Sequence, residues 1–176
     1  MAYAERRLSV HLSRGRSKVR TFFRFLLTGL WLIHGGLCGA TDIMPLQSEQ
    51  VATLFNAYRG KPLIVEIWSL DCNYCRDNMK RIVQWQRMHK NVSIIMVSMD
   101  TMSDIDELKR VLANLNVLRF PQYVNAESIP EKLRAALDPA WHGEMPRTLF
   151  IGKDGKRSAS SGLLRLEVLT ELLGSH

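Results

Sequence analysis

The sequence predicts an α/β domain built as a three-layer sandwich, with a central mixed β-sheet flanked by helices. Two near-continuous apolar runs, residues 63–68 and 92–99, are typical of strands that are buried on both faces. Each run is followed by a segment in which apolar residues recur with helical spacing. A third strand, a turn, a short fourth strand and a final helix come near the C-terminus. This order favours a sheet with both parallel and antiparallel strands.

Three helices are predicted in the first part of the domain, from apolar side chains that recur every three or four residues. The first has Ser48 as its N-cap and stops at Gly60, a residue type that commonly ends helices. The second covers residues 72–89. The third covers residues 104–115, with Ser103 as its N-cap and acidic residues in its first turn, where the helix dipole favours negative charge.

The later part of the chain carries fewer regular signals. Residues 116–140 contain three prolines and are expected to be irregular, apart from a short helix over 131–137. A third strand over 148–152 leads through a turn at 153–156 into a short fourth strand near 157–160. A helix closes the chain.

The positive charge of the chain is concentrated at its N-terminus. Of the 24 Lys and Arg residues, seven lie within residues 1–40, against the single acidic residue Glu5. The rest of the chain therefore holds 17 basic and 16 acidic residues. Nucleic-acid-binding proteins carry their excess positive charge on the folded domain. No binding to nucleic acid is expected here.

The first forty residues have the layout of an export signal. A basic stretch precedes a short apolar run over residues 25–33 and small residues up to Ala40, as in a secretory signal peptide. The alternative is an uncleaved membrane anchor, although the apolar stretch is shorter than the about 20 residues that a span needs. We therefore expect residues 1–40 to be a signal peptide or N-terminal membrane anchor. Residues 41–176 would form the domain, either periplasmic or secreted, or anchored to the inner membrane and facing the periplasm.

Cys72 and Cys75 stand between a predicted buried strand and a predicted helix. In an exported protein, such a pair can persist as a disulfide. A helix N-terminus stabilises a thiolate on the first cysteine, which can attack a disulfide, and the second cysteine can resolve the mixed disulfide that forms. We therefore expect a catalytic pair in which Cys72 attacks and Cys75 resolves.

Two other interpretations of the cysteine pair stay open. A purely structural disulfide is one, although closing so short a loop adds little stability. Half of a zinc site is the other, but zinc needs two further ligands, and the histidines after residue 40 are scattered. We expect neither a bound metal nor a cofactor.

Several motifs of the predicted domain occur together in one known group of proteins. They are Gly60-Lys61-Pro62, the strand ending in Trp68, the C-x-x-C pair, and Met145-Pro146 before a strand with Asp154-Gly155-Lys156 after it. In this combination the chain resembles the thioredoxin superfamily, and more narrowly its exported TlpA/ResA-like thiol–disulfide oxidoreductases. The resemblance covers roughly residues 46–173. It implies a thioredoxin-like sandwich.

The resemblance also implies a substrate-binding segment. Pro146 matches the proline that in this superfamily follows a cis peptide bond beside the cysteines, so Met145 and Pro146 would contact the substrate. The alternative is an ordinary trans proline at the start of a strand. Trp68 would flank the same site, although a tryptophan at a strand end can equally fill the core.

Glu66 is the one charged residue of the predicted strand over 63–68, six residues before Cys72. Burial raises the pKa of a carboxyl group, so Glu66 could exchange protons near neutral pH. Thioredoxin-like proteins often carry a buried acid at this place, which implies that Glu66 is a catalytic general base for Cys75. The alternative is a carboxylate that reaches water or pairs with a lysine.

The chain departs from the TlpA/ResA pattern at two positions near the cysteines, and the second of these bears on the direction of the reaction. Asn78 stands where a glutamate is common, and Asp71 replaces a common tryptophan before Cys72. The negative charge of Asp71 disfavours a thiolate on Cys72, and a higher thiol pKa accompanies a more reducing pair. This favours a reductase.

The expected partners are client proteins with disulfides and a membrane thiol donor that keeps the protein reduced. Contact with a membrane is expected only through an N-terminal anchor. Three alternatives remain: a disulfide oxidase or isomerase of the same fold, a copper- or zinc-handling protein, and a binding module without catalysis.

Overall fold

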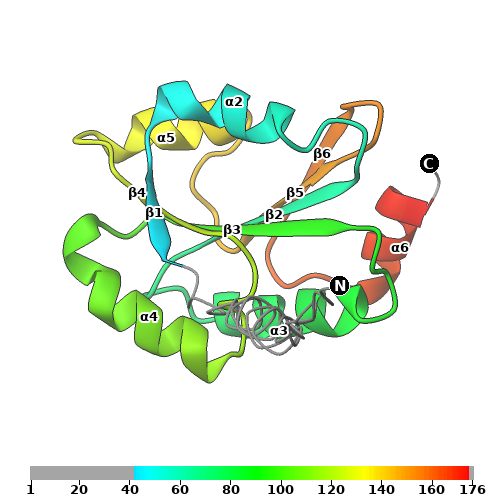
Figure 1. Ribbon diagram of the computed structural model, residues 1–176, viewed down its shortest axis with the longest axis horizontal. Coiled ribbons are helices and arrows are strands. Elements are labelled where there is room, and N and C mark those ends of the chain that lie inside the picture. The colour runs from blue at the N-terminus through cyan, green and yellow to red at the C-terminus, as the bar shows by residue number, and fades with distance from the viewer. Residues whose placement is uncertain (1–41, 175–176) are drawn as a thin grey trace, which may run out of the picture. The chain divides into compact units, whose positions relative to one another are not determined.

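A six-stranded mixed β-sheet runs through residues 42–174, the part of the chain that the structure, a computed structural model, describes (Figure 1). The strands lie in the order β1-β4-β3-β2-β5-β6. Strands β1, β4, β3 and β2 are mutually parallel, and β5 is antiparallel to both β2 and β6. Their bounds are β1 (Ile43–Leu46), β2 (Leu63–Trp68), β3 (Ser93–Ser98), β4 (Gln122–Asn125), β5 (Arg147–Ile151) and β6 (Arg157–Ser161).

Helices cover both faces of this sheet, which confirms the predicted three-layer α/β sandwich (Figure 1). One face carries the 3-10 turn η1 (Ser48–Gln50), α2 (Val51–Asn56) and α5 (Pro130–Leu137). The other face carries α3 (Cys75–Gln86), the 3-10 turn η2 (Met102–Asp104), α4 (Ile105–Asn114) and α6 (Leu166–Gly174). None of the helices in the described part of the chain is long and apolar enough to cross a membrane.

The central strand β2 is buried on both faces, as its apolar run predicts. None of its six residues is more than 1 % exposed. Because side chains alternate along a strand, Leu63, Val65 and Ile67 pack in the cluster with α2 and α5. Ile64 and Trp68 pack in the cluster with α3, α4 and α6. Glu66 lies between these two on the same face and so points toward α3.

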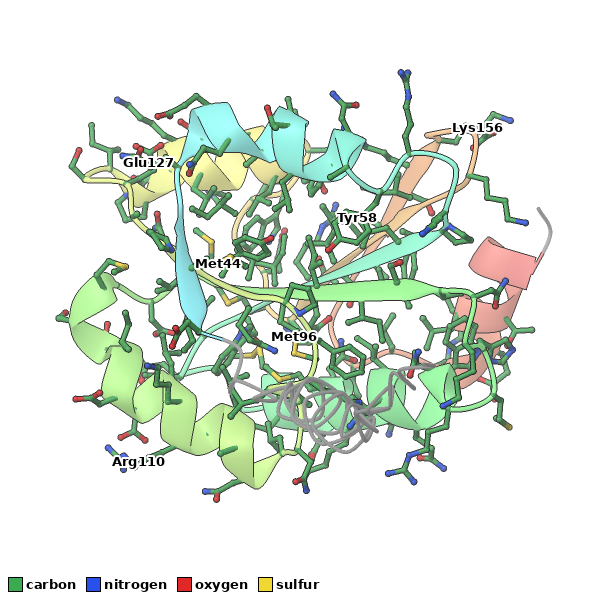
Figure 2. The ribbon with its side chains drawn as sticks, viewed as in Figure 1. Met44, Tyr58, Met96, Arg110, Glu127 and Lys156 are labelled. Atoms are coloured by element: carbon green, nitrogen blue, oxygen red, sulfur yellow. A yellow bond between two sulfur atoms is a disulfide. The ribbon has the colours of Figure 1, made fainter. Side chains whose placement is uncertain are left out.

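The two hydrophobic clusters fill the space on either side of the sheet, with charged residues outside them. Met96 of β3 belongs to the cluster beneath α3 and α4. Figure 2 shows it between the sheet and these helices, while Arg110 of α4 and Lys156 of the β5–β6 turn point outward. In that turn, Gly155 has φ +81°, a conformation in which a residue without a Cβ is favoured.

The two predicted N-caps are wrong by one or two residues. Gln47, not Ser48, precedes the first helical turn, and its N–H bonds to the side chain of Gln50. Thr101, not Ser103, precedes the turn before α4, and its N–H bonds to Asp104. In both cases the reciprocal bonds of a capping box decide where the helix begins.

Two short strands are not anticipated by the sequence patterns. β4 lies in the segment expected to be irregular; its residues include Gln122 and Asn125, so it lacks an apolar run. Its pairing with β3 and β1 makes it a strand, a case of tertiary contacts overriding local propensity. β1 is an edge strand that contains Pro45, a residue tolerated only at such edges. The predicted short helix over 131–137 is confirmed as α5.

The predicted signal peptide or anchor, residues 1–40, lies outside the described residues. Its division from the domain at residue 41 stays a prediction.

Candidate active site

Cys72 and Cys75 form a disulfide at the N-terminal end of α3. Their Cα atoms are 5.4 Å apart. Cys75 is the first residue of α3 and is fully buried, whereas Cys72 lies in the preceding turn and is half-buried. An incoming thiol or disulfide can therefore reach Cys72 but not Cys75. The helix predicted over 72–89 is shorter at both ends, because the N–H of Cys72 bonds to Ser69 in a turn before α3 begins.

The turn that carries Cys72 is fastened to the end of β3. The N–H of Leu70 donates to both carboxylate oxygens of Asp100, at 3.2 and 3.0 Å. Ser98 orients this carboxylate by donating to it at 2.6 Å. These residues meet because β2 and β3 are parallel, so their carboxyl ends lie at the same edge of the sheet. The sequence offers one signal for Asp100, a polar residue directly after a buried strand.

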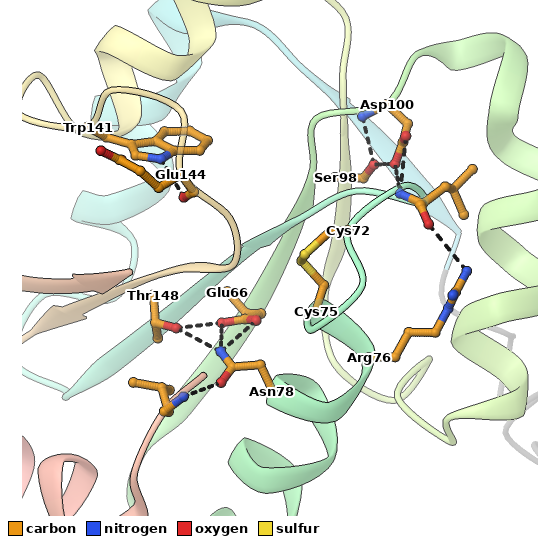
Figure 3. The surroundings of a disulfide bond; sticks show 12 residues. Glu66, Cys72, Cys75, Arg76, Asn78, Ser98, Asp100, Trp141, Glu144 and Thr148 are labelled. Atoms are coloured by element: carbon orange, nitrogen blue, oxygen red, sulfur yellow. Dashed lines mark hydrogen bonds between the residues drawn. A yellow bond between two sulfur atoms is a disulfide. The ribbon is translucent and has the colours of Figure 1, made fainter. Parts of the chain in front are cut away.

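Glu66 is a fully buried carboxyl group at the centre of a hydrogen-bond network (Figure 3). The amide nitrogen of Asn78 lies 2.9 and 3.1 Å from its two oxygens, and the hydroxyl of Thr148 donates to it at 2.7 Å. Burial raises the pKa of Glu66 from its ordinary value of 4.5 to about 8, while the hydrogen bonds from Asn78 and Thr148 lower it. The predicted burial and raised pKa are thus confirmed. Among the described residues, no cation pairs with Glu66.

Glu66 and Cys75 belong to one buried region. Cys75 packs in the same cluster as Ile64 and Trp68, the two neighbours of Glu66 on its face of β2. Asn78 is three residues after Cys75, so both side chains project from the same face of α3. In Figure 3 the side chains of Glu66 and Cys75 both lie at the start of α3.

Asn78 and Thr148 are the site residues that sequence reasoning missed. Asn78 enters the sequence analysis only as a departure from a family pattern, yet it is fully buried and binds Glu66. Thr148 lies directly opposite Glu66 in the register of β2 and β5. Asn78 lies three residues after Cys75, on the same helix face, and this spacing is a signal in the sequence. The contact of Thr148 with Glu66 spans 82 residues of sequence, so no local pattern indicates it.

The peptide bond between Met145 and Pro146 is cis, as the resemblance predicts. β5 starts at the next residue, Arg147, which pairs with Ile67. Met145 and Pro146 therefore lie at the end of β2, at the edge of the sheet that carries the turn with Cys72. Met145 is half-buried and Pro146 is buried. Their contact with a substrate stays a prediction.

The loop before Pro146 is held at several points. Arg147 and Asp138 form an ion pair whose side chains are each 14 % exposed. Trp141 is buried, its indole N–H donates to the carbonyl of Glu144 at 2.8 Å, and its own carbonyl accepts a bond from Arg134. Figure 3 shows the Trp141–Glu144 bond within this loop. The segment that presents Met145 is thus braced independently of any substrate.

Trp68 is 1 % exposed and lies in the core beside Cys75. Its indole N–H has no hydrogen-bond partner within residues 42–174. This placement matches the core-filling interpretation of the residue, and its predicted contact with a substrate stays a prediction. No group of three or more His, Cys, Asp or Glu side chains in residues 42–174 is arranged to hold a metal ion.

Comparison with known proteins identifies the family. The model of the AhpC/TSA family matches residues 42–157. No curated protein matches the chain.

Solved structures with the same fold include several thiol–disulfide proteins. The chain is 16 % identical to a secreted Mycobacterium tuberculosis disulfide oxidoreductase homologous to E. coli DsbE, with a TM-score of 0.54 over 69 % of this chain and 86 % of that one. It is 16 % identical to MTB DsbF, with a TM-score of 0.55 over 68 % and 84 % of the two chains. It is 21 % identical to a thiol-disulfide isomerase from Corynebacterium glutamicum, with a TM-score of 0.53 over 69 % and 83 %.

At these identities the likeness shows the fold, which is thioredoxin-like. The family match covers most of the described domain, and the domain contains a C-x-x-C disulfide at the start of a helix. The chain belongs to the AhpC/TSA family, and its thioredoxin-like fold carries the Cys72–Cys75 disulfide at the start of α3.

Proposed function

We propose that this protein reduces disulfide bonds of exported client proteins. The observation that carries the proposal is the unequal burial of the two sulfurs above a buried acid. Cys72 is reachable from solvent and Cys75 is not. Glu66 is buried on the face of β2 against which Cys75 packs, and burial raises its pKa to about 8. This arrangement suits an attacking thiol, a resolving thiol and a proton acceptor.

The direction of the reaction follows from the charges near the sulfurs. A pair is strongly oxidising when its surroundings stabilise the thiolate of the reduced form. Here the residue next to Cys72 in the chain is the exposed acid Asp71. Negative charge disfavours a thiolate. The reduced form of the Cys72–Cys75 pair is therefore only weakly stabilised, so the pair is expected to reduce other disulfides.

The first step attaches the substrate to the enzyme. The thiolate of Cys72 attacks one sulfur of the client disulfide, and a mixed disulfide forms. The other client sulfur leaves as a thiolate and takes a proton from solvent. Met145 and Pro146 would hold the client chain beside Cys72 during this step.

The second step releases the substrate. Glu66 accepts the proton of the Cys75 thiol, and the Cys75 thiolate attacks the sulfur of Cys72. The bond between Cys72 and the client breaks, and the second client sulfur leaves with the electron pair and is protonated. Two electrons have passed from the dithiol to the client. The product is the Cys72–Cys75 disulfide, the form in which the structure shows the protein.

A dithiol donor must then return two electrons to Cys72–Cys75. We propose a membrane thiol donor and a location outside the cytoplasm, because residues 1–40 have the layout of an export signal or anchor. The description of a structural relative as secreted supports this location.

The reduction potential of the Cys72–Cys75 pair tests the proposed direction. We expect a value below about −200 mV, measured by equilibration with dithiothreitol or glutathione buffers and alkylation of free thiols. A value at or above about −180 mV, the range of isomerases and oxidases, would overturn the reductase assignment and favour an isomerase or oxidase. Glu66→Gln serves as a matched variant that keeps both sulfurs.

A further inference from the structure

Asn78 occupies the centre of the network around Glu66. Its amide nitrogen contacts both oxygens of Glu66 and lies 3.1 Å from the hydroxyl oxygen of Thr148. An amide nitrogen carries two hydrogens and acts only as a donor. Its two hydrogens are therefore shared among the oxygens of Glu66 and Thr148, which act as acceptors toward it.

The orientation of the Asn78 amide is fixed from a distant part of the chain. The backbone N–H of Leu164, in the segment between β6 and α6, donates to the amide oxygen of Asn78 at 2.7 Å. A flipped amide would set two N–H donors against each other at Leu164 and point its oxygen at the oxygens of Glu66. Only the observed orientation satisfies all partners. Asn78 is thus held as a donor to Glu66 (Figure 3).

Thr148 is a second hydrogen-bond partner of Glu66. Unlike the Asn78 nitrogen, its hydroxyl can either donate or accept. Its hydroxyl donates to Glu66 at 2.7 Å while its oxygen lies within reach of the Asn78 amide. A hydroxyl can donate to a carboxylate and, after rotation, accept from a carboxylic acid. Thr148 can therefore stay bonded to Glu66 in either protonation state, but its bond to the charged carboxylate is the stronger one, so Thr148 also favours the ionised form.

The other groups that face Glu66 carry no charge of their own. Its register partner on β3 is Met96 and its partner on β5 is Thr148. From α3 come Asn78 and, one turn earlier, Cys75, whose thiol is the one titratable neighbour on that helix face in the reduced protein. Burial and the bonds from Asn78 and Thr148 are the causes that set the pKa of Glu66.

We propose that Asn78 and Thr148 are positioning residues that hold the Glu66 carboxylate ready to take the proton of Cys75. This inference rests on the proposed role of Glu66 as the proton acceptor. Asn78 does not touch the reacting sulfurs in this arrangement; it acts by favouring the ionised form of a carboxyl group that burial would otherwise keep protonated.

Asn78→Leu tests the proposal, because leucine fills a similar volume without donating a hydrogen bond. We expect the pKa of Glu66 to rise above its wild-type value. This pKa is measured by ¹³C NMR of the labelled side-chain carboxyl group. If that pKa rises from about 8 to about 9, the ionised fraction at pH 7 falls about tenfold. Release of a model substrate from Cys72 by Cys75 should then slow about tenfold at pH 7, with its inflection moved to higher pH.

Thr148→Val and Thr148→Ser are a second pair of test variants, with a smaller expected effect on the inflection. Valine keeps the shape of threonine and removes the hydroxyl, so it should move the inflection in the same direction as Asn78→Leu. Serine keeps the hydroxyl and should restore the wild-type profile. Asn125→Leu is the matched control, since it also replaces a buried asparagine, whose side-chain oxygen accepts from the N–H of Glu127 on a strand that does not pair with β2. It should leave the inflection in place.

The outcomes separate this inference from the proposed function. If Asn78→Leu and Thr148→Val lower stability and rate but leave the pKa of Glu66 unchanged, the two residues are merely structural and the inference is overturned. If the pKa of Glu66 moves but the rate profile of substrate release does not follow it, Asn78 and Thr148 do tune Glu66, and Glu66 is not the proton acceptor of Cys75.

Discussion

The two sulfurs of the disulfide lie in surroundings of different kinds. Cys72 stands in a half-exposed turn that is held by backbone-to-carboxylate bonds from Leu70 to Asp100. Cys75 is buried against a face of β2 where the polar groups bind one another through side chains. We call Cys72 and its turn the outer half of the site, and Cys75 with Glu66 and the hydrogen-bond partners of Glu66 the inner half. The outer half is accessible to a substrate, and the inner half controls the position of a proton. Substitutions in the two halves should therefore have different consequences.

Exchanging each cysteine for serine should give the largest difference between the halves. Cys72→Ser removes the reachable sulfur and should reduce client disulfides no faster than buffer does. Cys75→Ser keeps that sulfur, so it should attack once and accumulate the mixed disulfide. Mass spectrometry of the enzyme after reaction with a disulfide peptide distinguishes the two. Equal capture of peptide by both variants would contradict the assignment of Cys72 as the attacking thiol.

Glu66→Gln should reveal the cost of burying a carboxyl group in the inner half. The pKa of Glu66 is raised from 4.5 to about 8 in the folded protein, so between these values the folded state holds a proton that the unfolded state has lost. The free energy of unfolding of the wild type should fall over this range as pH rises, by about 5 kcal/mol at most. Glutamine does not titrate, so the variant lacks this loss.

Urea denaturation of both proteins at about pH 5, 7 and 9 measures this effect. The stability of Glu66→Gln relative to the wild type should increase with pH and level off above about pH 8. A difference that stays constant across this range would mean that the carboxyl group titrates normally in the folded protein.

Asp100→Ala should loosen the outer half and leave the inner half intact. The N–H of Leu70 loses its acceptor, which costs about 1–3 kcal/mol if the group stays out of contact with water. The attack of Cys72 on a client should slow by roughly tenfold, since a misplaced nucleophile loses part of its orientation. Stopped-flow measurement of the first step checks this, and a changed pH inflection of the second step would show that the two halves are not separate.

Asp71→Asn should have the smallest effect. It removes one exposed negative charge next to Cys72, and exposed charges act weakly because solvent screens them. The thiolate fraction of Cys72 should rise a few-fold, measured from the pH dependence of alkylation by iodoacetamide. No increase would remove the contribution of Asp71 to the reducing character of the pair.

Local sequence signals locate the two cysteines and Glu66, but not the residues that bind Glu66. The apolar run of β2, the C-x-x-C pair and the acid inside the run are patterns within ten residues of one another. They predict the strand, the helix after it and the buried Glu66. The cis bond before Pro146 follows only from resemblance to a family, because no local pattern distinguishes it from a trans bond.

The partners of Glu66 could not be read in the same way. Thr148 is 82 residues from Glu66, and Leu164 is 86 residues from Asn78. These contacts depend on the pairing of β5 with β2 and on the position of the segment after β6. The register of strands is fixed by the whole sheet, as the unanticipated β1 and β4 also show.

The pH dependence of substrate release from Cys72 by Cys75 tests the central claim most directly. It is measured by stopped flow with the reduced wild type and with Glu66→Gln. We predict that the wild-type rate rises with an inflection near pH 8 and that Glu66→Gln is slower by about a hundredfold there and lacks this inflection. If the two proteins share the same rates and the same profile, Glu66 does not receive the proton of Cys75.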